Sequence, residues 1–304
     1  TAFIVMAQIS FAQNQSRYNV IFISLDDMND KCSILDFPAV LTPNVQRIAA
    51  HGMVFKNAYS NYPLCNPSRT SVLSGFRPDR TQVFGNDQDP RANIGWGVRF
   101  LPEYFHDYGY HTERYSKIMH GAFENECQWD YYYDWDIESP DILVHENNNA
   151  GVINPGGPSS WFIEQSPDDS TQNGTVARKT DSALRAQKTQ PFFIGVGLSA
   201  HNPFTPGLKY WNEYGDSTVQ DLLRIDLKGK TSDIRGNGSG DIALPQTPAT
   251  DKNDIPSIAF TKNIVVQSDS EWRRSVHAYY SEVTDMDTQL GFIVDAIDSL
   301  NLWS

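Results

Sequence analysis

Two short apolar segments, each followed directly by polar residues, constrain the fold more than any other feature of this chain. The first, "YNVIFISLDD", covers residues 18–27, and the second, "FFIGVGL", covers residues 192–198. Continuous apolar runs of this length are typical of strands buried on both faces of a parallel sheet. Helical patterns lie between them, for example at residues 42–52, where Thr42 is a candidate cap and Pro43 fits the first helical position. Strands that alternate with helices predict an α/β domain with a mainly parallel sheet sandwiched by helices.

The other segments extend this pattern and add two long loops. Residues 53–60 read as a strand, 98–110 as a helix, and 111–120 as a short strand that leads into a loop. Residues 145–160 and 215–256 are rich in Gly, Asn, Asp, Ser and Pro and predict long loops. The last helical pattern carries an apolar stripe at spacings of three, four and seven residues, formed by Val276, Tyr280, Val283, Leu290, Val294 and Ile297.

The beginning of the chain and its charge bear on where the protein works. Residues 1–12, "TAFIVMAQISFA", are apolar and small and end in a pattern like a signal-peptidase site. They are interpreted as the remnant of a signal peptide, which predicts an exported protein, periplasmic or secreted; a buried first strand is the alternative. With 24 Lys and Arg against 37 Asp and Glu, the net charge is −13, which argues against nucleic acid as a partner. No apolar stretch reaches the roughly 18 residues that cross a bilayer, so no stable membrane insertion is expected.

One of the three cysteines lies in the segment "YPLCNPSRTSVLSG", residues 62–75. Asn66 suits a helix cap and Pro67 the first helical position, so Cys65 is expected just before a helix N-terminus. The helix dipole and Arg69, one turn later, could lower the pKa of this thiol and make it reactive. A small buried cysteine beside an ordinary helix start is the alternative.

Several familiar chemistries are excluded by spacing. Three residues separate Cys65 from Arg69, which is too few for the phosphate cradle of thiol-based phosphatases. The chain has no G-x-x-x-x-G-K-[ST], G-x-G-x-x-G, C-x-x-C or H-E-x-x-H motif. The two other cysteines, Cys32 and Cys127, could pair with each other if their Cα atoms approach.

The pattern that does fit is C-x-P-S-R, together with a strand that ends in two aspartates. It closely resembles the type I sulfatases of the alkaline phosphatase superfamily. The segments "LDD", "LCNPSRTSVLSG", "SKIMH", "PFFIGVGLSAHNPF" and "YYSEVTDMDTQLG" extend the resemblance over nearly the whole chain, which looks most like the iduronate 2-sulfatase branch and bacterial polysaccharide sulfatases. The resemblance implies an alkaline-phosphatase-like sulfatase fold and a sulfuric ester hydrolase that acts on a sulfated sugar or polysaccharide.

In such enzymes the motif cysteine is oxidised to formylglycine after synthesis. The resemblance therefore implies that a formylglycine-generating enzyme converts Cys65, and that a hydroxyl of the hydrated aldehyde attacks sulfur. It also implies that Asp26, Asp27 and the modified Cys65 bind Ca²⁺, a cation that prefers oxygen ligands, and that Arg69 orients the formylglycine. Taken alone, two carboxylates after a strand are ordinarily turn or cap residues.

Two further segments carry candidate site residues. The resemblance implies that Lys117 and His120, in "SKIMH", contact the sulfate and the formylglycine hydroxyl, and that His201, in "SAHNPF", binds sulfate and protonates the leaving oxygen. Taken alone, Lys117 and His120 would read as solvated polar residues and His201 as a hydrogen-bonded structural histidine. Asp287, near the apolar stripe of the last helix, is interpreted as structural.

One departure from the family pattern concerns the end of the chain. Family members carry a further strand, often ending in "SDHG", that completes the metal site, and a later lysine that contacts sulfate; neither has a match here. Residues 13–304 are therefore interpreted as an incomplete N-terminal catalytic domain without the smaller C-terminal domain. This chain alone is expected to be inactive, to bind calcium weakly and to expose part of the last helix's apolar stripe.

Two alternatives to a sulfatase remain open. One is a phosphodiesterase or phosphonate hydrolase of the same superfamily, since some of these use the same formylglycine. The other is a glycan-binding relative that has lost catalysis, against which the intact Cys65, Pro67 and Arg69 argue.

Overall fold

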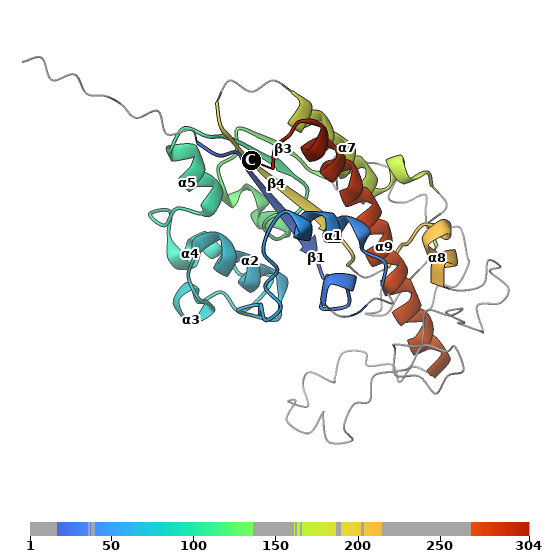
Figure 1. Cartoon of the computed structure of the whole chain (residues 1–304). Coiled ribbons are helices and arrows are strands. Elements are labelled where there is room, and N and C mark those ends of the chain that lie inside the picture. Colours follow the sequence, from blue (N-terminus) through green and yellow to red (C-terminus); the bar gives the residue numbers. More distant parts are fainter. Residues whose placement is uncertain are drawn as a thin grey trace, which may run out of the picture.

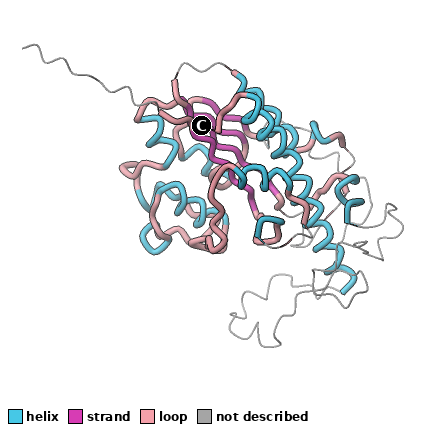
Figure 2. Tube along the Cα trace, in the orientation of Figure 1, coloured by secondary structure: helices cyan, strands magenta, loops and turns pink. Residues whose placement is uncertain are grey.

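A parallel sheet lies at the centre of the part of the chain that the structure describes (Figures 1 and 2). The computed structural model describes residues 17–35, 37, 40–135, 161, 163–164, 166–186, 190–201, 204–214 and 269–303. Within these ranges the sheet has four strands in the order β1-β4-β2-β3, with β1 at Val20–Asp26, β2 at His111–Tyr115, β3 at Tyr131–Tyr133 and β4 at Phe192–Ser199. All three strand pairs are parallel, as the sequence predicts.

Strand β4 is the last of the four along the chain but lies between β1 and β2. Val20 of β1 pairs with Phe193 and Asp26 with Ser199, while His111 of β2 pairs with Phe192 on the other side. This register brings the carboxyl ends of β1 and β4 together. Ligand sites of open α/β folds lie at this edge of the sheet.

Helices cover both faces of the sheet, which confirms the predicted sandwich (Figure 1). The helices are α1 (Pro43–Ala50), α2 (Cys65–Ser74), α3 (Pro78–Thr81), α4 (Pro90–Ile94), α5 (Leu101–Asp107), α7 (Gln172–Arg185), α8 (Leu208–Tyr214) and α9 (Asp269–Ser299), with short 3-10 turns η1 (Ser33–Leu35), η2 (Gly121–Glu126) and η5 (Asp168–Ser170). Alternate side chains of β4, such as Ile194 and Val196, enter a core that α1, α7 and α9 cover. On the opposite face Phe193 stacks on Phe105 of α5 and on Trp129, at ring-centroid distances of 4.6 Å and 6.0 Å.

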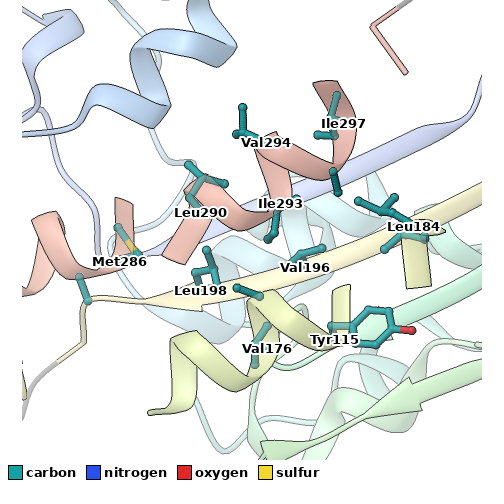
Figure 3. Packing of buried hydrophobic residues seen from close by; sticks show 14 of the residues in the cluster. Tyr115, Val176, Leu184, Val196, Leu198, Met286, Leu290, Ile293, Val294 and Ile297 are labelled. Carbon is teal, nitrogen blue, oxygen red and sulfur yellow. The ribbon is translucent and has the colours of Figure 1, made fainter. Parts of the chain in front are cut away.

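The apolar stripe of α9 forms a large part of the core that lies between the sheet and helices α1, α7 and α9 (Figure 3). Val283, Leu290 and Val294 have no exposed surface, and the other stripe residues are buried or half-buried. Helix α9 contacts α1, α7, α8 and β4, so these elements cover the stripe. The expectation that part of this stripe is exposed is therefore wrong.

Asp287 has the structural role that the sequence analysis assigned to it. Its carboxylate accepts hydrogen bonds from the backbone N–H groups of Asn44, at 3.0 Å, and of Val45, at 2.8 Å. These are amides of the first turn of α1, which have no partner within the helix. The predicted cap, Thr42, makes no side-chain cap bond because its hydroxyl contacts that of Ser33 at 2.7 Å.

Two of the expected secondary-structure elements differ from the structure. Residues 53–60 are not a strand, although the segment begins with three consecutive apolar residues; the side chains of Met53, Phe55 and Tyr59 are exposed. A strand needs a hydrogen-bonding neighbour, and no described strand pairs with this segment. Helix α2 begins at Cys65 rather than at Pro67.

Several other expectations fall where they cannot be compared with the structure. Residues 1–12 and the loops at 145–160 and 215–256 lie outside the described residues.

The structure settles whether Cys32 and Cys127 pair, which the sequence left open. Both are free cysteines. Among the helices that the structure describes, none has both the length and the apolar character that crossing a bilayer requires.

Two buried carboxylates of α9 hold the segment that follows β4. Glu282 accepts a hydrogen bond from the backbone N–H of Thr205, at 2.8 Å, and Asp285 accepts one from that of Gly207, at 3.1 Å. Gln289 donates a further bond to Asp285, at 3.2 Å. Burial raises the pKa of Glu282 well above its ordinary value and raises that of Asp285 to about 6.

Asp285→Asn is expected to change how stability depends on pH. Because the pKa of Asp285 is higher in the folded state than the unfolded value of about 3.9, its contribution to stability is fully present below that value. It is lost as the pH rises through about 6. Between pH 4 and pH 7, the free energy of unfolding measured with urea should fall on the order of 2 kcal/mol more for the wild type than for Asp285→Asn. Asp79→Asn, at an exposed carboxylate, is the control; a stability difference between wild type and Asp285→Asn that is independent of pH would contradict the buried titration.

Candidate active site

The first two residues of the site lie where β1 ends. Asp26 is the last residue of β1 and is buried, with 7% of its surface exposed, while Asp27 beside it is exposed. Asp27 has a φ of 57°, in the left-handed region that aspartate tolerates better than most residues. The chain therefore turns sharply at the edge of the sheet.

Arg69 connects this strand end to α2 and to the loop after β2. Its guanidinium donates to Oδ1 of Asp26 at 2.7 Å and to the carbonyl oxygens of Lys117 and Ile118 at 3.0 Å and 2.9 Å. The Arg69 and Asp26 side chains are only 10% and 8% exposed. A planar guanidinium with several donors suits such a many-sided contact better than a lysine would.

Lys117 provides the second positive charge at Asp26. Its Nζ lies 2.6 Å from Oδ2 of Asp26. Burial acts to raise the pKa of Asp26, but the charges and hydrogen bonds of Arg69 and Lys117 outweigh it and hold this pKa below its ordinary value. Asp26 is therefore a carboxylate at neutral pH.

Cys65 opens α2 and faces the same two aspartates. One oxygen of Asp26, one of Asp27 and the sulfur of Cys65 all lie within 4.8 Å of one another, close enough to share a metal ion. Burial raises the pKa of the Cys65 thiol, and the opposing charges of Lys117 and Arg69 do not reverse this. Of the two readings that the sequence left open for this thiol, the raised pKa argues against the reactive thiolate, because burial and the nearby carboxylates of Asp26 and Asp27 favour the protonated form.

Two histidines lie on neighbouring loops of the same sheet edge. Nε2 of His201, which follows β4, lies 3.6 Å from Oδ2 of Asp27. His120 lies three residues after Lys117 in the same loop, and its buried Nδ1 has no hydrogen-bond partner among the residues that the structure describes. Burial is the main cause that lowers the pKa of His120, and the positive charges of Lys117 and Arg69 lower it further. The imidazole is therefore neutral at neutral pH.

An open pocket of about 740 Å³ joins most of these residues. Its lining includes Asp26, Asp27, Cys65, Arg69 and His201. The structure thus brings five of the seven predicted site residues to one cavity. Lys117 reaches the group through its ion pair with Asp26, and His120 is near enough for the charges of Asp26, Arg69 and His201 to affect its pKa.

Three supporting residues escaped the sequence analysis. Glu124 of η2 accepts from the backbone N–H groups of Met119 and Ile118, at 2.9 Å and 3.3 Å, and so holds the loop between Lys117 and His120. Asn173 of α7 exchanges two hydrogen bonds with the backbone of Ser199, just before His201. Gly197 of β4 allows the backbone of Lys117 to approach, since a Cβ built there would lie 2.2 Å from its carbonyl oxygen. These contacts join residues far apart in the sequence, and no local motif announces them.

A comparison with protein families identifies the class of protein that this fold and site belong to. The family model described as Sulfatase matches residues 18–304. The chain belongs to the sulfatase family.

Individual relatives agree with this assignment. A protein named "Sulfatase" from Formosa agariphila is 26% identical, over 92% of this chain and 55% of its own length. Iduronate 2-sulfatase from Mus musculus is also 26% identical, over 93% of this chain and 52% of its own length. The chain therefore spans about half the length of these relatives.

The fold itself is shared with solved structures. The phosphonate monoester hydrolase of Agrobacterium radiobacter superposes with a TM-score of 0.63 and 17% identity, over 94% of this chain and 60% of that one. At this level of identity the likeness concerns the fold alone. It confirms the predicted α/β architecture.

Proposed function

We propose that the protein hydrolyses sulfate esters of a sulfated sugar. The observation that carries this proposal is the convergence of Asp26, Asp27, Cys65 and Arg69 on one open pocket at the carboxyl ends of β1 and β4. A sulfate ester carries a negative charge that repels nucleophiles, and its alkoxide is a poor leaving group. Catalysis therefore needs positive charge, a strong nucleophile and a proton donor in one place.

Cys65 is proposed to be the precursor of the nucleophile. A thiol with a raised pKa is largely protonated at neutral pH and attacks poorly, which favours a precursor over a working thiolate. A formylglycine-generating enzyme would oxidise Cys65 to an aldehyde, whose hydrate provides a hydroxyl nucleophile. Arg69 would orient this group, because its side chain is already fixed by Asp26 and by the loop after β2.

Asp26, Asp27 and the modified Cys65 are proposed to hold a calcium ion. Their ligand atoms fit one cation, and carboxylate oxygens are the ligands that Ca²⁺ prefers. When bound, the ion would supply positive charge that stabilises the developing negative charge on the sulfate oxygens. Arg69 and Lys117 keep Asp26 ionised, which maintains its ability to bind a cation.

The remaining site residues are proposed to bind sulfate and to move a proton. Lys117 and His120 would contact the sulfate and the nucleophilic hydroxyl, and His201 would bind sulfate and protonate the leaving oxygen. His201 is suited to this because it is exposed and lines the pocket. These cationic and polar groups provide a locally attractive site for an anion on a protein with a net charge of −13.

The substrate is proposed to be a sulfated sugar acid or polysaccharide, and the site to belong to a longer, exported enzyme. The relative named iduronate 2-sulfatase supports a sulfated uronic acid or polysaccharide as the substrate. Residues 13–304 are proposed to form the N-terminal part of the catalytic domain of an exported enzyme, in line with the 52–55% of their length that the relatives share with this chain. The smaller C-terminal domain and the remaining metal ligands would belong to that longer protein.

Modification of Cys65 provides the direct test. Co-expression with a formylglycine-generating enzyme is expected to make the tryptic peptide that contains Cys65 lighter by about 18 Da, as –CH₂SH becomes –CHO. The peptides that contain Cys32 and Cys127 serve as internal controls and should keep their masses. An unshifted Cys65 peptide, from cells in which a control substrate is converted, would contradict the precursor role.

Turnover then separates the sulfatase from its alternative. The modified protein, in its full length, is expected to hydrolyse an aryl sulfate faster than the matching aryl phosphate diester or phosphonate. The opposite preference would assign the protein to the phosphonate hydrolases. Absence of turnover by protein that carries formylglycine and binds calcium would favour a glycan-binding role.

A further inference from the structure

The hydroxyl of Tyr279 on α9 bridges the turn that carries Asp27. It donates to the carbonyl oxygen of Asp27, at 2.9 Å, and accepts from the backbone N–H of Asn29, at 3.0 Å. Asp27 and Asn29 precede Tyr279 in the sequence by 252 and 250 residues. A single side chain thus closes both ends of the turn after β1.

This turn needs support because of its backbone geometry. Asp27 has a φ of 57°, and a non-glycine residue in the left-handed region persists where its surroundings hold it. Within the turn, the backbone N–H of Met28 donates a hydrogen bond to the carbonyl oxygen of Leu25. At 3.4 Å this bond is long. The Tyr279 bonds are shorter, and they act on the residue that places its carboxylate beside Asp26 and Cys65.

The same tyrosine also contacts the segment that follows β4. Its ring meets that of Phe204 edge to face, with centroids 5.4 Å apart. Phe204 lies three positions after His201, whose Nε2 approaches the carboxylate of Asp27 at 3.6 Å. Tyr279 therefore touches both of the loops from which Asp27 and His201 enter the pocket.

We propose that Tyr279 is a positioning residue that fixes the Asp27 turn and thereby sets the affinity of the site for its cation. This inference rests on the proposed function, because it assigns to Asp27 the role of a cation ligand. Residues that orient metal ligands without touching the metal commonly change metal affinity about 10–100-fold when they are removed. Tyr279 does so through the backbone of the ligand-bearing turn.

The test compares two adjacent tyrosines of α9. Tyr279→Phe removes the hydroxyl and keeps the ring that packs on Phe204. Tyr280→Phe is the matched control, because Tyr280 faces the core and its ring packs against Phe37, with centroids 5.7 Å apart. Calcium binding by calorimetry, hydrogen exchange of the peptide that contains Asn29, and the melting temperature are measured on the full-length protein for both variants.

Tyr279→Phe is expected to weaken calcium binding about 10-fold or more and to speed exchange of the Asn29 amide, even without calcium. Tyr280→Phe should leave both quantities at the wild-type values whatever it does to the melting temperature. Wild-type calcium affinity or wild-type exchange in Tyr279→Phe would overturn the inference while the proposed function stands. Failure of the wild-type protein to bind calcium would overturn the cation site of the proposed function and the inference with it.

Discussion

Replacing His201 with alanine is expected to lower the turnover of sulfate esters with poor leaving groups by about 10²–10⁴-fold. The imidazole lines the pocket, on the loop after β4, and is proposed to give a proton to the oxygen that leaves. An alkoxide with a high pKa requires that proton, whereas a nitrophenolate leaves without it. Rates measured on the formylglycine-bearing enzyme with a series of aryl and alkyl sulfates should therefore show a loss that shrinks as the leaving group becomes more acidic.

The dependence on the leaving group distinguishes proton transfer from binding. Equal losses for good and poor leaving groups would show that His201 binds or orients the sulfate and does not protonate the leaving oxygen. His51→Ala is a suitable control, because His51 stacks on Trp303 at the end of α1 and is not part of the pocket lining. Its rates should match those of the wild type across the series.

Gly197→Ala is expected to destabilise the protein by about 3 kcal/mol or more and to abolish activity in whatever fraction remains folded. A Cβ at this position would lie 2.2 Å from the carbonyl oxygen and 2.7 Å from the nitrogen of Lys117. These are backbone atoms, which cannot rotate away, so either β4 or the Lys117 loop must move. Overpacking of a well-filled core typically costs about 1–3 kcal/mol, and a backbone collision lies at or beyond the upper end of that range.

Gly195→Ala, two residues earlier in β4, provides the matched control. There a Cβ would meet side-chain atoms of Ile118 and Trp129 at 3.1 Å, and these can yield by a few tenths of an ångström. Urea unfolding should therefore show a much smaller loss of unfolding free energy for Gly195→Ala than for Gly197→Ala, and Gly195→Ala should keep more activity. Equal costs would show that loss of glycine in β4, and not the collision with Lys117, is what destabilises the protein.

The fold was predictable where the signal was local. The continuous apolar runs marked β1 and β4, and Pro43 and the stripe of α9 marked two helices, because each pattern reflects burial or backbone chemistry within one element. The segment at 53–60 failed for the complementary reason. Its apolar and aromatic residues favour a strand, but whether a strand forms depends on a neighbour elsewhere in the chain.

Which residues gather at the candidate site was also predictable, although their electrostatics and supports were not. Motif resemblance indicated Asp26, Cys65 and His201, and the structure brings them to one pocket. It could not indicate that burial raises the pKa of Cys65, because that depends on the packing around the thiol. Likewise, Glu124 acts on the site through the backbone of a loop, and such contacts place no demand on the residue types of the neighbouring sequence.

The position of β4 in the sheet has a consequence for the order in which the protein is made. Residues 27–191 separate β1 from its described partner β4, and at about 5–20 residues per second their synthesis lasts on the order of 10–30 s. During that interval β1 is an apolar segment without its neighbour, vulnerable to pairing with other chains. The pocket cannot form before β4 has joined the sheet, so Cys65, once made, remains until then in a nascent chain whose candidate active-site edge does not yet exist.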